Sequence, residues 1–167
     1  MESIQQAQPA DAAAVLELIK ARIRWMDEQG IRQWNTTGYL EAYGLDYFMQ
    51  AARQGVLYVF RPPQGSIQGA VILLEEDPRW PDGAPACYVH NLVTACGVPG
   101  VGQALLAFCR RHALGLGKQY LRLDCAANNR KLNRYYEAQG FQWAGSVEEG
   151  PYRGNKRQVL LAEEDAP

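Results

Sequence analysis

The stretch from Tyr88 to Phe141 constrains the fold of this chain most, because strand-like and helix-like segments alternate in it around a glycine-rich loop. Its composition and periodicity predict a strand at 87–94, a helix at 101–114, a strand at 120–125 and a helix at 128–139. The loop Gly97-Val-Pro-Gly-Val-Gly102 joins the first strand to the first helix. Backbone N–H groups at a helix start point toward one place, which suits a phosphate. The stretch therefore predicts a phosphate site between a strand and a helix.

The remaining segments predict a mixed architecture. Helices are expected at 9–29 and 39–54, and strands at 3–8, 56–60, 67–74, 141–148 and 157–163. A loop, Gly150-Pro-Tyr-Arg-Gly-Asn155, separates the last two strands. The order β-α-α-β-β-β-α-β-α-β-β interleaves both kinds of element, which places the chain in the α/β (α+β) class. At 167 residues the natural expectation is one domain, 1–167.

Charge and composition exclude several partners. The formal net charge is −1, so no basic field is available for nucleic acid or for an anionic membrane. No apolar run approaches the roughly 20 residues that span a bilayer. Residues 1–6 have neither the basic nor the apolar region of a signal peptide. We therefore expect no membrane partner.

The cysteines and histidines favour a cytoplasmic protein without a metal. Four cysteines are present and form no C-x-x-C pair, namely Cys87, Cys96, Cys109 and Cys125. Free buried thiols are typical of a reducing cytoplasm. His90 and His112 are the only histidines, and no paired His/Cys spacing is present, so no metal site is expected.

The glycine-rich loop does not match the two best-known phosphate motifs. No Gly-Lys-Ser/Thr follows Gly102, so the loop is not a P-loop. The dinucleotide pattern G-x-G-x-x-G is absent as well. Taken alone, the loop favours an ordinary glycine-rich strand-to-helix turn.

A second pattern follows the loop. Asn129 comes four residues after Cys125, Tyr136 comes seven residues after Asn129, and Gly140-Phe141 begins four residues after Tyr136. With Tyr136-Glu-Ala-Gln-Gly-Phe141, this spacing resembles the GNAT superfamily of N-acetyltransferases. The resemblance implies a mixed, mostly antiparallel twisted sheet of six to seven strands, flanked by about four helices.

The loop also resembles the family's upstream signature, Gln/Arg-x-x-Gly-x-Gly/Ala. This chain has Gly97-x-x-Gly100-x-Gly102 at that place, with Gly97 where the family usually has Gln or Arg. Pro99 has no N–H to give to a ligand. The resemblance is carried by Tyr88 to Phe141 and implies acetyl-CoA as the cofactor.

The resemblance also implies where the cofactor binds. By position, the cofactor-binding residues are Leu92, Val93, Val98, Gly100, Val101, Gly102, Gln103, Asn129 and Tyr136. The backbone of Leu92 and Val93 would pair with the pantetheine arm as an added strand does. The loop amides would hold the pyrophosphate, helped by the helix dipole, and Asn129 would bond to the pantetheine.

The catalytic residues implied by the resemblance are Tyr136 and His90. Tyr136 would protonate the leaving thiolate, and the N–H of Val93 would stabilise the oxyanion. His90 resembles a strand histidine that relays a proton in arylalkylamine acetyltransferases, and an imidazole titrates near neutral pH. A structural role for His90 is equally consistent with the sequence, and Glu75, Glu76 or bulk water are alternative proton acceptors.

Two neighbouring pairs require a choice. The four-residue step to Gly140 selects Tyr136 over Tyr135, and the seven-residue step selects Asn129 over Asn128. Asn128 is then a candidate helix cap, because Asn is favoured at that position.

The acceptor site is less specified. In the family, the region between the first two helices lines the acceptor pocket, so Trp25, Arg32 and Trp34 are candidate substrate-binding residues. Tyr152, between the last two strands, is a further candidate. The alternative is a solvated loop with anchoring tryptophans.

The function predicted from these patterns is an acyltransferase reaction. An N-acetyltransferase would move an acetyl group from acetyl-CoA to a primary amine of a small molecule, by direct attack in a ternary complex. One alternative is a protein or peptide N-acetyltransferase. Another is a non-catalytic acyl-CoA-binding module. The resemblance also implies a possible homodimer.

Overall fold

The computed structural model describes residues 3–165. Residues 1–2 and 166–167, at the ends of the expected domain, lie outside the described residues, and so does the start of the segment in which no signal peptide was expected. Within the described range no helix is long and apolar enough to cross a membrane.

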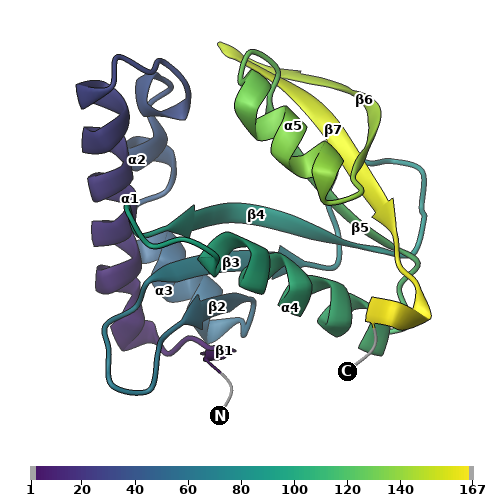
Figure 1. The fold of residues 1–167 in the computed structure, drawn as a ribbon, viewed down its shortest axis with the longest axis horizontal. Helices are drawn as coiled ribbons and strands as arrows, with labels where there is room; N and C mark the ends of the chain where they lie inside the picture. Colours follow the sequence, from purple (N-terminus) through teal and green to yellow (C-terminus); the bar gives the residue numbers. More distant parts are fainter. Residues whose placement is uncertain (1–2, 166–167) are drawn as a thin grey trace. The chain divides into compact units, whose positions relative to one another are not determined.

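Residues 3–165 form seven strands and five α-helices, in agreement with the predicted α/β class (Figure 1). The strands are β1 (Ile4–Gln6), β2 (Leu57–Phe60), β3 (Gly69–Leu74), β4 (Ala86–Thr94), β5 (Tyr120–Ala126), β6 (Gln142–Glu149) and β7 (Tyr152–Leu160). The α-helices are α1 (Ala12–Glu28), α2 (Tyr39–Ala42), α3 (Leu45–Arg53), α4 (Val101–Gly115) and α5 (Arg130–Ala138). Three short 3-10 helices are η1 (Pro9–Asp11), η2 (Trp34–Thr36) and η3 (Glu163–Asp165).

The strands form one sheet in the order β1-β2-β3-β4-β5-β7-β6. The pairs β1–β2, β2–β3, β5–β7 and β6–β7 are antiparallel, whereas β4 and β5 are parallel. A parallel pair needs a crossover between its strands, and α4 is the helix in that connection. The mostly antiparallel sheet confirms the predicted fold.

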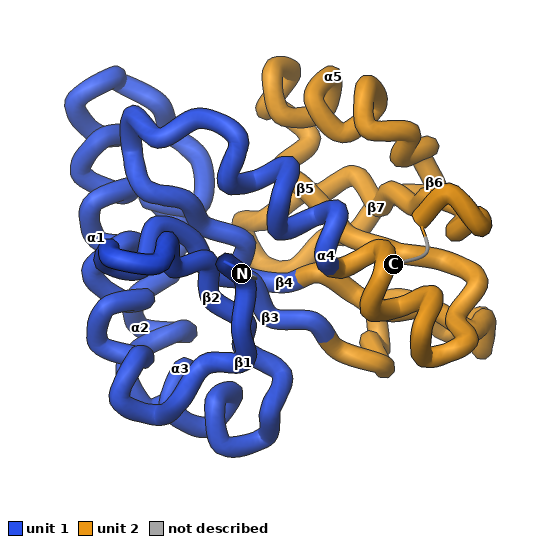
Figure 2. The backbone as a smooth tube through the Cα atoms, turned by 60° about the horizontal axis from the view of Figure 1, so that its bottom comes forward, with its two compact units in different colours: residues 1–73, 90–108 blue, residues 74–89, 109–167 orange. Residues whose placement is uncertain are grey.

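The chain divides into two compact units, coloured separately in Figure 2. The first unit holds the described residues up to 73 together with 90–108. In it, α1 packs against α3. Its fully buried side chains include Val15, Ile19, Phe48, Leu57, Val59 and Val71.

The second unit holds residues 74–89 and 109 onward. In it, β7 pairs with β5 along seven residues of β5 and also with β6, and α5 packs on β5. Its buried side chains include Cys87, Cys109, Ala113, Leu121 and Phe141. Cys87, Cys109 and Cys125 are free and buried as expected, whereas Cys96 is free but exposed.

The predicted helix at 39–54 is wrong as a single element. It divides into α2 and α3 at Tyr43 and Gly44. Tyr43 leaves the helical conformation with φ −129° and ψ 74°, and Gly44 is the N-cap of α3. Glycine disfavours a helix interior, because it loses the most backbone freedom on ordering.

The predicted loop from Gly150 to Asn155 is also wrong. β7 begins at Tyr152, and β6 continues to Glu149, so Gly150 and Pro151 alone connect them. Gly150 has φ +54°, a conformation that glycine adopts without steric cost. The tight turn keeps Tyr152 in register opposite Glu149.

A buried arginine ties the 74–89 segment to the sheet of the second unit. Arg122 in β5 is 3 % exposed, and its guanidinium donates to both carboxylate oxygens of Asp82, at 2.8 and 2.7 Å. It also donates to Gln158 at 3.0 Å and lies over the Trp80 ring, 4.4 Å from the centroid. Every polar edge of the buried cation therefore meets an acceptor or an aromatic face, as burial of a charge requires.

This ion pair makes the free energy of unfolding depend on pH in the acidic range. The hydrogen bonds from Arg122 lower the pKa of Asp82 from 3.8 to about 2. The pair therefore stabilises the fold above the ordinary carboxyl pKa, and this stabilisation is lost as the pH falls toward 2. Because the Asp82 side chain is 52 % exposed, solvent keeps the effect modest.

We expect Asp82→Asn to lower the urea midpoint at pH 6 and to flatten its decline below pH 4. Glu17→Gln, in an exposed pair with Lys20, should keep the wild-type slope; equal slopes in all three proteins would contradict the assignment.

Candidate active site

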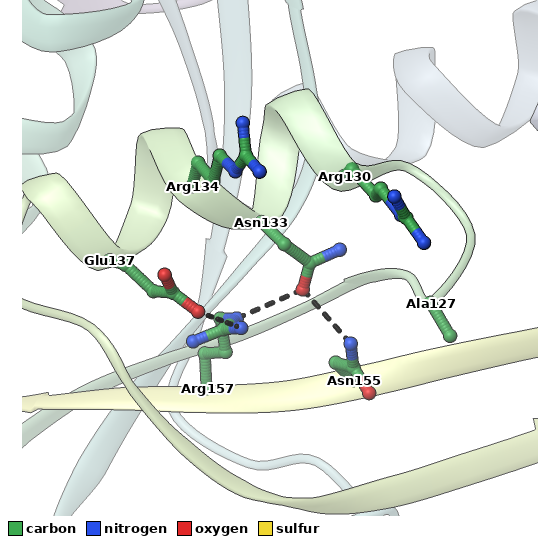
Figure 3. Close-up of a pocket in the computed structure, with 7 residues that line it drawn as sticks. All are labelled: Ala127, Arg130, Asn133, Arg134, Glu137, Asn155 and Arg157. Carbon is green, nitrogen blue, oxygen red and sulfur yellow. Dashed lines mark hydrogen bonds and ion pairs between the residues drawn. The ribbon is translucent and has the colours of Figure 1, made fainter.

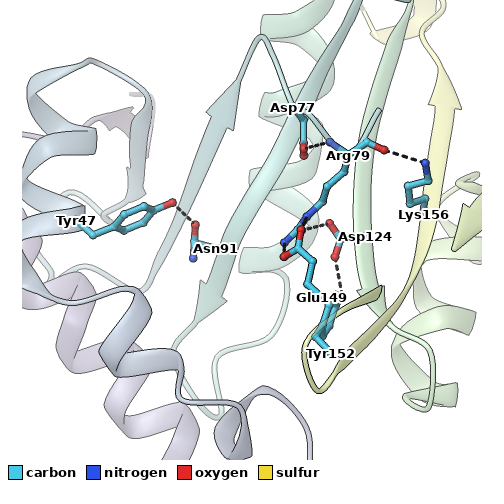
Figure 4. A network of polar contacts seen from close by, with 8 residues as sticks. All are labelled: Tyr47, Asp77, Arg79, Asn91, Asp124, Glu149, Tyr152 and Lys156. Carbon is cyan, nitrogen blue, oxygen red and sulfur yellow. Dashed lines mark hydrogen bonds and ion pairs between the residues drawn. The ribbon is translucent and has the colours of Figure 1, made fainter. Parts of the chain in front are cut away.

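The end of β4 carries a backbone conformation that is unusual for a strand. Asn91 has φ +51°, and it is the only residue other than glycine with a positive φ within 3–165. Its side-chain nitrogen donates to the Tyr39 hydroxyl at 2.6 Å. Its side-chain oxygen accepts from the Tyr47 hydroxyl at 2.9 Å (Figure 4). Asn tolerates the left-handed region better than most residues. Two tyrosines thus hold a strained residue next to Leu92 and Val93, where strain often marks a functional site.

The strain at Asn91 predicts a stability effect that can be separated into two parts. Asn91→Ala loses both hydrogen bonds and places an alanine at φ +51°, where its Cβ is strained and no polar side chain compensates. We therefore expect a loss of about 2–4 kcal/mol in unfolding free energy. Asn91→Gly loses the same hydrogen bonds but relieves the backbone, and should cost about 1–2 kcal/mol. Chemical denaturation measures both. Equal losses would show that the backbone at this position is unstrained.

Three contacts from within the first unit fix the segment after Asn91. Arg22 of α1 donates to the Thr94 carbonyl at 2.9 Å and to its hydroxyl at 3.2 Å. The Ala95 amide donates to the Gln68 carbonyl at 2.8 Å. A Cβ at Gly69 would lie 3.3 Å from the Val93 carbonyl oxygen, so a side chain there would crowd the two backbones. The backbone of Leu92 and Val93, predicted to bind the cofactor, is therefore anchored before it at Asn91 and after it at Thr94 and Ala95.

The glycine-rich loop has the geometry of a cradle. Gly97 and Gly100 have φ +76° and +85°, and no described heavy atom beyond the adjacent residues lies within 4 Å of where their Cβ atoms would be. α4 begins directly afterwards at Val101, which is buried. A Cβ at Gly69 would also lie 2.6 Å from a Val101 methyl, so β3 seats the start of the helix closely. The amides of Gly102 and Gln103 lie in the first turn, where helix amides have no acceptor within the helix.

Tyr136, predicted to be a catalytic residue, belongs to the second unit. Its ring packs edge-on against Phe141 and Tyr135, with centroids 5.7 and 5.5 Å away. The residue is 6 % exposed, and burial raises the pKa of its phenol. Its hydroxyl has no hydrogen-bond partner among residues 3–165. Every fully buried side-chain polar atom in that range has a partner, so this hydroxyl is not fully buried. The hydroxyl therefore keeps unused hydrogen-bonding capacity at a partly accessible position.

Asn129 occupies the helix-capping position that was expected of Asn128. It is the N-cap of α5, and its side-chain oxygen accepts from the Leu132 amide at 3.1 Å. The prediction that Asn128 caps this helix is wrong, because α5 begins at Arg130, two residues after the predicted start at 128. The cap fixes the side-chain orientation of Asn129 at the end of β5.

An aromatic stack in the first unit includes one of the predicted acceptor residues. Trp34 packs on Tyr39 with centroids 4.6 Å apart, Tyr39 packs on Tyr43 at 4.7 Å, and Tyr43 packs on Tyr47 at 4.8 Å. The spacing of four between the tyrosines was a signal in the sequence that they share one side of the segment. Burial raises the pKa of Tyr47 to about 12, so this phenol stays neutral at working pH.

Two further candidates for the acceptor site, Trp25 and Arg32, do not belong to this aromatic stack. Trp25 is 37 % exposed and contacts Arg22, whose guanidinium carbon is 5.1 Å from its ring centroid. Arg32 is exposed in the same unit. Trp25 lies in α1, and Asn35 ties the loop that carries Arg32 to this helix by donating to Asp27 at 2.7 Å. The structure thus joins Trp34 to the tyrosines and Trp25 to a cation.

Tyr152 belongs to a polar network that sequence reasoning missed (Figure 4). Its hydroxyl donates to Asp124 at 2.6 Å, and burial raises the pKa of the Tyr152 phenol. Arg79 bridges Asp124 at 2.9 Å and Glu149 at 2.8 and 2.6 Å. The Lys156 ammonium donates to the Arg79 carbonyl at 2.9 Å. The residues in these contacts are 28 to 77 positions apart in the chain, so no local spacing in the sequence predicts the network.

The predicted site residues fall into both units. Leu92, Val93, His90 and the glycine-rich loop lie in the first, with Trp25, Arg32 and Trp34. Asn129, Tyr136 and Tyr152 lie in the second. His90 is half-buried in β4. Across residues 3–165, no group of three or more His, Cys, Asp or Glu side chains is arranged to hold a metal ion.

Comparison with known proteins points to one family. Residues 19–141 match the family described as "Acetyltransferase (GNAT) family". The chain is 24 % identical over 149 residues to YesJ of Bacillus subtilis (strain 168), described as an uncharacterized N-acetyltransferase; the match covers 84 % of this chain and 81 % of YesJ.

Solved structures share the fold. A GNAT-family acetyltransferase from Listeria monocytogenes 4b F2365 superposes with a TM-score of 0.78 at 24 % identity, covering 95 % of this chain and 94 % of that chain. An N-acetyltransferase from Staphylococcus aureus Mu50 superposes with a TM-score of 0.70 at 19 % identity, covering 95 % and 98 %.

Proposed function

Because the chain belongs to the GNAT family of acetyltransferases, we propose that it transfers the acetyl group of acetyl-CoA to a primary amine of a small molecule, by direct attack in a ternary complex. The observation that carries the proposal is the Tyr136 hydroxyl, a protonated donor on a buried ring that no described side chain engages. The open glycine cradle before α4 supports the choice of a phosphate-bearing cofactor.

Acetyl-CoA would supply an activated acetyl thioester. The amides of Val98, Gly100, Val101, Gly102 and Gln103 would hold its pyrophosphate, since they lie in the loop and the first helical turn. The backbone of Leu92 and Val93 would pair with the pantetheine arm. Asn129 would contact the same arm from the start of α5.

The chemistry assigns one task to each remaining group. The Val93 N–H would stabilise the negative charge that develops on the carbonyl oxygen, and the contacts that hold residues 93–95 keep that donor in place. The Tyr136 hydroxyl would donate its proton to the leaving sulfur. Because burial raises the pKa of Tyr136, the donor remains protonated throughout the working pH range.

The incoming ammonium must lose a proton, and His90 is the proposed acceptor. It lies on β4 one residue before the strained Asn91 and two before Leu92. We expect His90→Gln to lower kcat/KM about 10²-fold near neutral pH and to alter the acidic limb of the pH–rate profile. Full activity and an unchanged profile would place the acceptor elsewhere. Asp124, whose charge acts on Tyr136 within the second unit, is then the group to change next.

The aromatic stack favours a particular kind of acceptor. The faces of Trp34, Tyr39, Tyr43 and Tyr47 would contact an apolar or aromatic body, and a cation over such faces is also attracted. A small amine with an aromatic or extended aliphatic body is therefore the proposed acceptor class. Acetylation of peptide N-termini or lysines, and acyl-CoA binding without turnover, are the alternatives.

One set of measurements separates these functions. Acetyl-CoA with a panel of aromatic amines, polyamines, amino acids and peptides, followed by free-thiol release, should show turnover with small amines. Turnover with peptides alone would support the second function. A thermal shift with CoA but no thiol release would support the binding module, and no shift at all would contradict cofactor binding, because a ligand that binds only the folded state stabilises it.

A further inference from the structure

The second unit contains a pocket of about 320 Å³ that the proposed reaction does not use (Figure 3). It lies between one side of α5 and strand β7, and we call it the α5–β7 pocket. Its lining residues are Ala127, Arg130, Asn133, Arg134, Glu137, Asn155 and Arg157. This volume is near the lower end of the range typical of small-molecule sites.

The floor of the pocket is a rigid polar cluster. The Asn133 side-chain oxygen accepts from Asn155 at 2.9 Å, from Arg157 at 3.1 Å and from the Cys125 thiol at 3.4 Å. Its side-chain nitrogen donates to the carbonyls of Ala126 and Asn129, at 3.0 and 2.9 Å. Asn133 is 7 % exposed and has no remaining hydrogen-bonding capacity.

The other side-chain acceptors are largely used as well. One Glu137 oxygen accepts from Arg157 at 2.9 Å, and Arg157 is 5 % exposed. The Asn155 oxygen accepts from the Trp143 indole at 3.3 Å. In contrast, Arg130 and Arg134 form no ion pair with any carboxylate in the described range. The pocket therefore offers mainly N–H donors.

The charge of the lining favours an anion. Three arginines and one glutamate give a formal charge of three minus one, or +2. A guanidinium presents planar N–H forks that match phosphate oxygens, and a phosphate monoester carries close to two negative charges at neutral pH.

An exposed aromatic residue adjoins the pocket. Trp143 is 61 % exposed, which is unusual for so large an apolar side chain, and its indole is held by Asn155. It is paired with Arg157 across β6 and β7, so both side chains project from the same face of the sheet. A planar ring on a ligand would find a stacking surface there.

We propose that the α5–β7 pocket binds a phosphate monoester that carries a planar ring, with Arg130 and Arg134 on its phosphate and Trp143 on its ring. Arg130 and Arg134 are spaced i, i+4 and share one stripe of α5, whereas Tyr136, which is assigned to acetyl-CoA, projects from another side of the helix. The phosphate would therefore lie on a different side of α5 from the proposed thioester. The site does not rest on the proposed function, since binding is measured without an acetyl donor.

The test is calorimetric titration with AMP as the probe, with inorganic phosphate and adenosine as partial ligands, in the presence and absence of excess CoA. We expect AMP to bind under both conditions. Arg134→Gln should weaken AMP about tenfold. Lys131→Gln removes the same charge from an exposed position on the same helix that does not line the pocket, and should change the affinity less than twofold. Trp143→Ala should weaken AMP and leave inorganic phosphate unaffected.

Three results would overturn the proposal. These are an absence of AMP binding, equal losses in Arg134→Gln and Lys131→Gln, and displacement of AMP by CoA. The last would make the pocket part of the cofactor site. If CoA itself fails to bind, the titrations without CoA still decide this proposal, so its failure and that of the acetyltransferase function are distinguishable. Thermal unfolding of each variant checks that the fold is retained.

Discussion

Tyr136→Phe is expected to lower kcat about 10²- to 10³-fold while leaving KM for acetyl-CoA nearly unchanged. The substitution removes one oxygen and keeps the ring, so the edge-on contacts with Phe141 and Tyr135 persist. The hydroxyl has no partner among residues 3–165, so no buried group is left unsatisfied and the stability change should be small. Steady-state kinetics with thermal unfolding measures both quantities.

Tyr135→Phe is the matched control for this result. Tyr135 is adjacent, carries the same phenol and is half-buried, but it projects from a different side of α5. It should retain activity within about twofold of the unchanged protein, since its hydroxyl would not reach the leaving sulfur. Equal activity in both variants would show that Tyr136 is a core aromatic and that the leaving thiolate needs no donor from this helix.

Gly100→Val is the second substitution with a large expected effect, a loss of about 10²-fold in CoA affinity. A side chain at Gly100 would enter open space in the cradle, where the pyrophosphate is proposed to lie. Because φ is +85°, the valine also costs about 1–2 kcal/mol of backbone strain. Calorimetry with CoA measures the affinity, and denaturation measures the strain.

Gly117→Val separates these two contributions. Gly117 has φ +75° and equally open surroundings after the end of α4, but it lies outside the cradle. It should lose similar stability and keep the unchanged protein's affinity for CoA. If Gly100→Val bound CoA as tightly as Gly117→Val does, the pyrophosphate would not lie at this loop.

Much of the fold was predictable because its signals are local. The helix α1 follows from apolar residues at helical spacing and ends before Gly30, which has φ +68°. Strands β2 and β3 follow from β-branched and aromatic runs on either side of a turn. The errors arose where local rules compete. Gly44 divides a continuous helical pattern, and the pairing of Tyr152 with Glu149 extends a strand into an expected loop.

The candidate site was predictable only in part. The glycine-rich loop and the stretch from Asn129 to Phe141 are each continuous in sequence, so the spacing of their residues was enough to predict them as parts of the site. The clamp on Asn91 joins residues 44 and 52 positions apart, and the bridge from Arg79 to Asp124 joins residues 45 apart. Such contacts form only when the chain has folded, and no residue in them is unusual by type. These contacts therefore fix residues in the folded structure but give no signal in the sequence.

Transfer of a labelled acetyl group tests the central claim most directly. The protein is incubated with acetyl-CoA deuterated in the acetyl group and with the amine that gives the fastest thiol release, and the products are followed by mass spectrometry. We expect a labelled N-acetyl amine in one-to-one proportion with free CoA, formed far more slowly by Tyr136→Phe. Free CoA without an acetylated amine, or equal product formation by both proteins, would contradict the central claim.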